Sequence, residues 1–177
     1  MGVPGDSNRD RGSGVRLVAA TPELRPGLLA LEPNPGDEEA WTGYGASIVP
    51  AAESDPTRHL VAIVAGGVVV GMLTLDWGPR SRRYAAPSEV GLHGFLIDRR
   101  QRRRGFARGA LAALPAFARR HHPAATAIAL TVNERNAAAL AAYRGAGFVD
   151  HGERFLGGGA GPQHVLRLAL AHAPPRS

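Results

Sequence analysis

The stretch that decides the fold is Gly91–Leu114, which reads GLHGFLIDRRQRRRGFARGALAAL. Its first residues form an apolar run typical of a β-strand, and its last ones follow an alanine-rich helical pattern. Between them lie the arginine block Arg99–Arg104 and the turn Gly105-Phe106-Ala107. Such a turn at a helix start binds anions, because its unpaired N–H groups and the helix dipole both favour negative charge. We therefore expect this turn to hold the pyrophosphate of a nucleotide-like cofactor.

The positive charge of the chain is concentrated at this same turn. The 177 residues carry a formal net charge of +6, and every basic residue among them is arginine. Most of that excess is supplied by Arg99, Arg100, Arg102, Arg103 and Arg104. A nucleic-acid-binding protein usually spreads its basic residues over a face or along a helix. The concentration therefore favours a compact polyanionic ligand over nucleic acid, with a solvated basic loop as the alternative.

Size and composition predict one globular domain. Hydrophobic residues make up 44% and charged residues 20%, an ordinary globular balance. We expect a disordered leader at 1–14, a single domain over 15–172 and a tail at 173–177. The first residues lack the apolar region of a secretory signal, and no apolar run is long enough to span a membrane. Without cysteine, neither disulfides nor thiolate metal sites are expected, and a cytoplasmic enzyme is the simplest class.

Hydrophobic periodicity and turn residues predict the element order β-α-α-β-β-β-α-β-α-β-β. The predicted strands are 15–19, 58–64, 68–77, 89–97, 127–132, 148–155 and 164–170. The predicted helices are 21–31, 37–54, 106–122 and 137–144. Pro115 should kink the third helix or end its first segment, because proline removes a helix hydrogen bond. The order predicts a mixed sheet with helices on its faces, and it is not the order of a dinucleotide-binding fold.

Two signatures stand out, one at Arg102–Ala107 and one at Asn136, Ala139, Tyr143 and Gly147-Phe148. Together they resemble the GCN5-related N-acetyltransferase (GNAT) family. The family's pyrophosphate motif, Q/R-x-x-G-x-G/A after a strand, corresponds here to Arg102–Ala107. Its second signature, Asn-x-x-Ala-x-x-x-Tyr followed closely by Gly-Phe, corresponds to Asn136, Ala139, Tyr143 and Gly147-Phe148. The distance between the two signatures and the order of elements also agree. The sequence departs from the motif at Arg103, which replaces its first glycine.

The resemblance covers roughly residues 15–170 and implies an α/β (mixed α+β) fold. The expected architecture is a central mixed, mostly antiparallel sheet with splayed central strands, flanked by about four helices. The implied activity is transfer of an acetyl group from acetyl-CoA to a primary amine of a small molecule or peptide, without a metal. Phe95-Leu96-Ile97-Asp98 is similar to the strand end of diamine and spermidine N-acetyltransferases. In those proteins the residue before the Phe is often Arg, whereas here it is Gly94. That likeness suggests a polyamine-like acceptor, and a homodimer is compatible with the family.

The resemblance also assigns cofactor-binding residues. The pyrophosphate turn comprises Arg102, Arg103, Arg104, Gly105, Phe106, Ala107 and Arg108. The main chain of Phe95, Leu96 and Ile97 would bond the pantetheine amides and the acetyl carbonyl, with Leu96 N–H or a neighbour as the oxyanion donor. Asn136 would cap the next helix and also contact CoA, with capping alone as the alternative.

The resemblance implies that Tyr143 is the general acid, since a phenol with a pKa of about 10 can protonate a thiolate. A helix tyrosine that packs on the sheet is the alternative. Period-2 alternation places Glu89, His93, Phe95 and Ile97 on one face of the central strand. His93 and Glu89 are therefore candidates for the general base. A structural histidine, and an enzyme that needs no base, both stay open.

The acceptor should be recognised by the 37–54 helix and the 78–88 loop. Glu38, Glu39 and Glu53 would attract a cationic amine, or they form a solvated helix face. The competing hypothesis is a non-catalytic module that senses acyl-CoA or binds nucleic acid through Arg99–Arg104.

Overall fold

The computed structural model describes residues 14–36, 41–159 and 161–170. Its strands are β1 (Val15–Ala19), β2 (Arg58–Ala65), β3 (Val68–Asp76), β4 (Glu89–Ile97), β5 (Ala127–Asn133), β6 (Val149–Phe155) and β7 (Gln163–Ala169). Its helices are α1 (Arg25–Leu29), α3 (Gly45–Glu53), α4 (Phe106–His121) and α5 (Ala137–Gly145). Two single 3-10 turns are η1 (Ser81–Arg83) and η2 (Arg99–Gln101). The order of strands and α-helices is the one predicted from the sequence.

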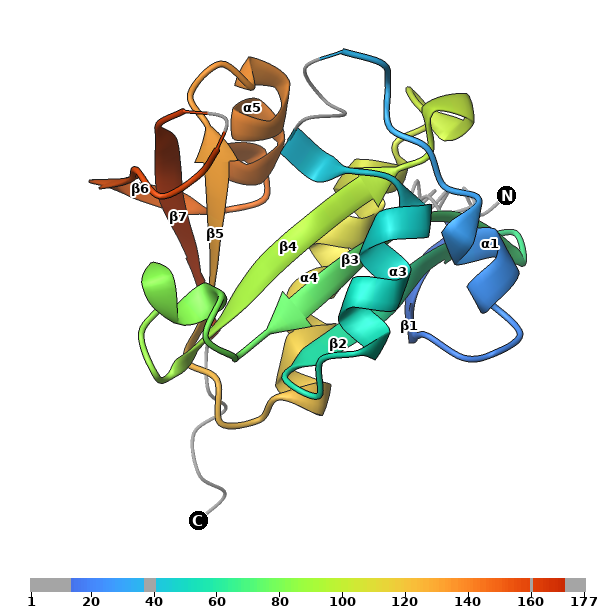
Figure 1. The fold of residues 1–177 in the computed structure, drawn as a ribbon, viewed down its shortest axis with the longest axis horizontal. Coiled ribbons are helices and arrows are strands. Elements are labelled where there is room, and N and C mark those ends of the chain that lie inside the picture. Colours follow the sequence, from blue (N-terminus) through green and yellow to red (C-terminus); the bar gives the residue numbers. More distant parts are fainter. Residues whose placement is uncertain (1–13, 37–40, 160, 171–177) are drawn as a thin grey trace, which may run out of the picture.

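The strands form one seven-stranded sheet in the order β1-β2-β3-β4-β5-β7-β6. Neighbouring strands are antiparallel throughout, except for the parallel pair β4 and β5. Helices α1 and α3 cover one face of the sheet, and α4 covers the other (Figure 1). The expected mixed, mostly antiparallel sheet is therefore confirmed, and its one parallel pair lies at the centre.

The hairpin of β2 and β3 shows how local sequence sets this topology. Gly66 and Gly67 join the two strands with φ angles of +56° and +80°. A two-residue turn with positive φ at both positions matches the right-handed twist of the strands, and glycine adopts it without strain. The hairpin was predicted at these residues, and it places β2 beside β3.

The two helices before β2 differ from their predicted extents. α1 begins at Arg25 instead of Thr21, because Pro26 and not Pro22 occupies its first turn. The predicted 37–54 helix is interrupted at Gly43, whose φ is +84°, and α3 begins only after Tyr44. The predicted start of that helix at Asp37 lies outside the described residues.

Of the two effects expected of Pro115, an end of the first segment of the third helix is wrong, and a kink stays a prediction. α4 is continuous from Phe106 to His121 with Pro115 inside it. Leu111 and Leu114 before the proline, and Phe117 after it, all pack into the same core against the sheet. Burial on both sides of the proline therefore offsets the missing backbone hydrogen bond.

Some expectations concern residues outside the described ranges. They are the leader before residue 14, the side chains of Glu38 and Glu39, and the tail at 173–177. Among the helices that the structure describes, none has both the length and the apolar character needed to cross a membrane.

Three histidines meet where β2 starts and α4 ends. His59 Nδ1 lies 3.3 Å from His122 Nε2, and the His59 and His121 rings pack edge to face. Burial, together with the neighbouring His121, lowers the pKa of His59. Burial and the two neighbouring histidines lower the pKa of His122 to about 4. The folded state therefore favours the neutral rings of His59 and His122.

This cluster should make the protein less stable in mild acid. In the unfolded chain these rings bind protons below about pH 6.5, whereas in the folded chain they bind them only at lower pH. The free energy of unfolding should therefore fall as the pH drops from about 6.5 toward about 4. We expect His122→Gln to flatten this dependence in urea unfolding at a series of pH values. The exposed His151, replaced by Gln, is the control and should keep the wild-type slope. A wild-type slope in the His122 variant would contradict the assignment.

Candidate active site

A bulge in β4 shapes the centre of the sheet. Met72 pairs with Leu96 and Thr74 pairs with His93, so the single residue Leu73 of β3 faces both Gly94 and Phe95 of β4. Gly94 has a φ of +54°, a conformation that a glycine adopts freely. A bulge leaves backbone groups of the extra residue outside the ladder and turns the strand. Unpaired main-chain donors are therefore available at this point.

The bulge also corrects the predicted faces of β4. Leu92 before it packs in the core beneath α4, whereas Leu96 after it packs in the core with α1 and α3. Strict alternation would place both on one face. Instead, Phe95 and Ile97 pack on the α4 side. The expectation that they share a face with His93 is wrong, because the extra residue reverses the alternation.

Strands β4 and β5 separate after Leu92, just before the bulge. Their parallel pairing runs only from Glu89 to Leu92 on β4 and from Ala127 to Leu130 on β5. Figure 1 shows the two strands diverging toward α5. A cavity of about 1690 Å³ opens at this divergence, with His93, Gly94, Phe95 and Ile97 in its wall. The predicted splay of the central strands is confirmed, and the cavity opens where they part.

One end of the cavity is the N-terminus of α4. Gly105 is the N-cap residue, with a φ of +77°, and a Cβ placed there would meet nothing within 4 Å. The walls also include Phe106, Ala107 and Arg108. The unpaired N–H groups of the first helical turn thus border open space beside a cationic side chain. This end has the shape and charge to hold a pyrophosphate.

Two members of the arginine block, Arg99 and Arg100, make ion pairs with acidic side chains. Arg100 bonds both oxygens of the buried Asp98 at 2.7 Å, and Arg99 pairs with Glu32 at 2.7 Å. The Arg100 guanidinium, above all, holds the pKa of Asp98 below its usual value. These two arginines join η2 to the end of α1, because Arg100 also donates to Ala30 O.

The side chains of the remaining arginines of the block lie at different pockets. Arg102 and Arg103 line the cavity. Arg104 bonds Gln101 at 2.6 Å, lies over the ring of Phe106 and borders a separate small pocket. Arg99 and Arg100 also line the cavity but are engaged by Glu32 and Asp98, so Arg102, Arg103 and Arg108 are the candidate cations for a phosphate.

Arg103 has a φ of +59°, the only positive value at a residue other than glycine in the described ranges. A left-handed conformation costs an L-residue about 1–2 kcal/mol, so Arg103→Gly should not lower the free energy of unfolding. The same change removes a cation from the cavity and should weaken acetyl-CoA binding about three- to tenfold. Calorimetric titration and urea unfolding measure the two effects.

Arg104→Ala is the matched control, because it removes a neighbouring guanidinium that lies outside this cavity. It should leave the acetyl-CoA affinity near wild type. Equal weakening in the two variants would show that only the net charge of the block matters.

Helix α5 brings the second signature to the cavity. The Asn136 side chain accepts a hydrogen bond from Ala139 N at 3.1 Å, which confirms its predicted capping role. Tyr143 is buried against Phe95 and Phe148, and its hydroxyl has no hydrogen-bond partner within the described part of the chain. Burial raises the pKa of Tyr143 well above its usual range. Both residues line the cavity, and the phenol keeps its proton.

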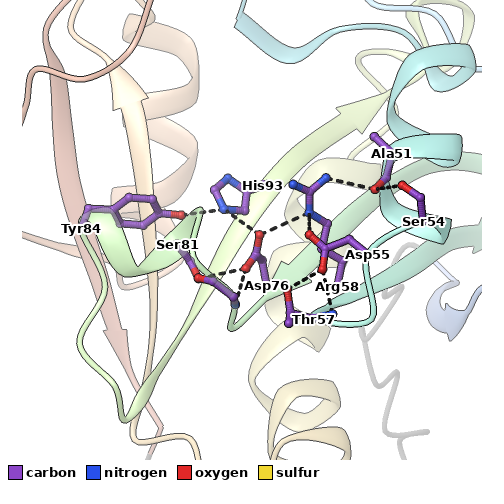
Figure 2. A network of polar contacts seen from close by, with 10 residues as sticks. Ala51, Ser54, Asp55, Thr57, Arg58, Asp76, Ser81, Tyr84 and His93 are labelled. Atoms are coloured by element: carbon purple, nitrogen blue, oxygen red, sulfur yellow. Dashed lines mark hydrogen bonds and ion pairs between the residues drawn. The ribbon is translucent and has the colours of Figure 1, made fainter.

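The opposite end of the cavity holds a buried polar network around His93 (Figure 2). His93 Nε2 lies 3.0 Å from the Tyr84 hydroxyl and 3.6 Å from Asp76 Oδ2. Arg58 Nε lies 3.5 Å from the same Asp76 oxygen and 3.1 Å from Asp55. Burial, then the charge of Arg80, lowers the pKa of His93 to about 4, although Asp76 opposes this. The ring is therefore neutral at about pH 7.

The side chains of two predicted site residues, Glu89 and Glu53, lie elsewhere, whereas the role predicted for Leu96 uses only its main chain. Glu89 is buried, pairs with Arg167 at 3.0 Å and accepts from Ala86 N, and it is absent from the cavity walls that the described residues form. Leu96 has its side chain in the core with α1 and α3. Glu53 pairs with Arg25 at 2.7 Å on the surface.

Sequence analysis missed Asp76, Arg58 and Tyr84. Each comes from a different element, and no motif joins them. The one local signal was Asp76 itself, a carboxylate at the end of an apolar strand.

The comparisons with known proteins agree with this geometry. The sequence model of the Acetyltransferase (GNAT) family matches residues 26–148, which include the α4 turn and the α5 signature. The chain belongs to the GNAT acetyltransferase family. No curated protein sequence matches this GNAT chain.

Solved structures similar to this GNAT chain share its fold at low sequence identity. AAC(6')-Ib in complex with parmomycin and acetyl-CoA is 18% identical, with a TM-score of 0.70 over 88% of this chain and 93% of its own. Spermidine N-acetyltransferase from Vibrio cholerae, in complex with CoA and spermine, is 16% identical, with a TM-score of 0.66 over 89% and 96%. The ribosomal-protein-S18-alanine N-acetyltransferase from Escherichia coli is 16% identical, with a TM-score of 0.64 over 92% and 98%.

Proposed function

We propose that this GNAT protein transfers the acetyl group of acetyl-CoA to a primary amine by direct attack in a ternary complex. The observation that carries the proposal is the continuous cavity between the splayed strands. It joins an anion-binding helix start at one end to a neutral histidine at the other. The unpaired backbone of the β4 bulge lies between them. A cofactor and an acceptor can thus approach the same point from opposite ends.

The cofactor end supplies binding and orientation. The N–H groups at the start of α4 and the cations Arg102, Arg103 and Arg108 would bind the pyrophosphate. Main-chain donors near Phe95, at the bulge, would bond the carbonyl oxygen, where negative charge develops. When bound, acetyl-CoA supplies a thioester whose C–S bond breaks as the amine nitrogen bonds to the carbonyl carbon.

Two side chains would move the protons. Tyr143 stays protonated because burial raises its pKa, and its hydroxyl would donate a proton to the leaving sulfur. His93 is neutral and lines the acceptor end, so it can take the proton that leaves the amine nitrogen. Glu89 is engaged by Arg167 and is the weaker candidate for this role.

The acceptor would enter beside Trp41, Ser47 and Ile48 at the α3 side of the cavity. The solved structures named above act on, or bind, aminoglycosides, spermidine and a protein alanine. The candidate acceptors are accordingly amines of small molecules, including polyamines, and amines of peptides.

Thermal unfolding with and without ligands tests this function. Acetyl-CoA at 100 times its dissociation constant should stabilise the protein by about 2.7 kcal/mol, and duplex DNA at moderate salt should not stabilise it. The competing nucleic-acid function predicts the reverse, with binding that weakens steeply as salt rises. A shift with DNA and none with acetyl-CoA would overturn the proposal.

A further inference from the structure

The buried carboxylate of Asp76 is held on one side only. Its Oδ1 accepts from Gly78 N at 2.7 Å and from Ser81 Oγ at 3.0 Å. Its Oδ2 has no hydrogen bond among the described residues, although the residue is completely buried. Burying a carboxylate oxygen without a hydrogen-bond partner costs free energy of folding. The position of this oxygen therefore suggests a role beyond stability.

That second oxygen is directed at His93 and Arg58. Oδ2 lies 3.6 Å from His93 Nε2 and 3.5 Å from Arg58 Nε (Figure 2). The carboxylate therefore lies between the guanidinium of Arg58 and the imidazole of His93. At these distances its electrostatic field acts on the imidazole.

A carboxylate beside Nε2 favours the tautomer that carries its hydrogen on this nitrogen, which can then donate to the Tyr84 hydroxyl 3.0 Å away. A neutral imidazole has one N–H, and the negative charge of Asp76 favours its position on Nε2. Nδ1 then keeps its lone pair and lies on the side of the ring away from Asp76 and Tyr84 (Figure 2). This is the arrangement that a histidine needs in order to accept a proton from a ligand.

We propose that Asp76 is a positioning residue that fixes His93 as its Nε2–H tautomer, so that Nδ1 can take the proton of the acceptor amine. The inference rests on the proposed function for the identity of the proton donor. The proton that leaves the amine nitrogen goes to Nδ1, and the imidazolium formed is stabilised by the neighbouring Asp76 carboxylate. The other groups that face the ring are Tyr84, Arg58 and Arg80. Both arginines oppose a positive ring, so the carboxylate must offset them.

The tautomer can be measured without any acceptor. Long-range ¹H–¹⁵N correlation spectra of the ¹⁵N-labelled protein distinguish Nδ1–H from Nε2–H, and the His93 signals are assigned by their loss in His93→Gln. Wild-type His93 should show the Nε2–H pattern at neutral pH. Asp76→Asn places an amide donor against Nε2 and should convert the ring to the Nδ1–H form. An Nδ1–H pattern in wild type, or an unchanged ring in Asp76→Asn, would overturn the proposal.

Asp55→Asn is the matched control. It removes the other carboxylate that pairs with Arg58, but it does not contact His93, so the tautomer should stay as in wild type. With an amine that the wild-type protein acetylates, Asp76→Asn should lower kcat roughly 100-fold and leave the KM for acetyl-CoA nearly unchanged. Normal kcat with a converted tautomer would contradict the role of His93 in catalysis. Failure of the proposed function would instead appear as absence of acetyl-CoA binding in wild type.

Discussion

Replacing Tyr143 with Phe should lower kcat about 100-fold or more while leaving acetyl-CoA affinity unchanged. The phenol is buried at the cavity wall, and its raised pKa keeps it protonated until it can donate to the leaving sulfur. Phe preserves the packing against Phe95 and Phe148 but has no proton to give. Steady-state kinetics and calorimetric titration of acetyl-CoA measure the two quantities.

Stability is the internal control of this experiment. The Tyr143 hydroxyl has no hydrogen-bond partner among the described residues, so its removal leaves no buried group unsatisfied. The unfolding midpoint of Tyr143→Phe should therefore be close to wild type. Wild-type turnover in this variant would remove Tyr143 as the general acid and leave it a packing residue.

Gly105→Ala should weaken acetyl-CoA binding at least about tenfold. The residue has a positive φ at the start of α4, and its backbone borders the anion-binding end of the cavity. A methyl group there would project into space that a pyrophosphate needs, and it would strain the turn that orients the N–H groups. Calorimetric titration gives the change in affinity.

Gly66→Ala is the matched control for Gly105→Ala. Gly66 also has a positive φ, and an added Cβ likewise meets nothing within 4 Å, but it lies in the β2–β3 hairpin. Both variants should lose a similar free energy of unfolding, about 1–2 kcal/mol, and only Gly105→Ala should lose affinity for acetyl-CoA. Equal loss of affinity in both would mean that global destabilisation, and not the turn, is responsible.

Much of the fold follows from local patterns in the chain. The double glycine at 66–67 predicts a hairpin, and the alternation over Ala127–Val132 predicts a strand. The helix after Gly105 was predicted correctly, although Pro115 was expected to kink it or to end its first segment. The second of these expectations was wrong because core packing on both sides of a proline is a tertiary effect, which a local rule does not include.

The site was predictable only in part. The cofactor end forms contiguous motifs, so Gly105 and its neighbours were identified from sequence. The β4 bulge was missed, although Gly94 within an apolar strand was a usable signal for it. The direction of each arginine depended on acidic partners such as Glu32, far away in the chain. The network around His93 joins Arg58, Asp76 and Tyr84, which only the folded sheet brings together.

The most direct test of acetyl transfer is release of free CoA thiol from acetyl-CoA in the presence of a panel of amines. The panel should include polyamines, aminoglycosides and peptides with a free N-terminus, with mass spectrometry to identify the product. Wild-type protein should release one thiol for each acetylated amine, and Tyr143→Phe should release far less with the same amine. An equal rate of thiol release with and without amine, and no acetylated product, would contradict an N-acetyltransferase.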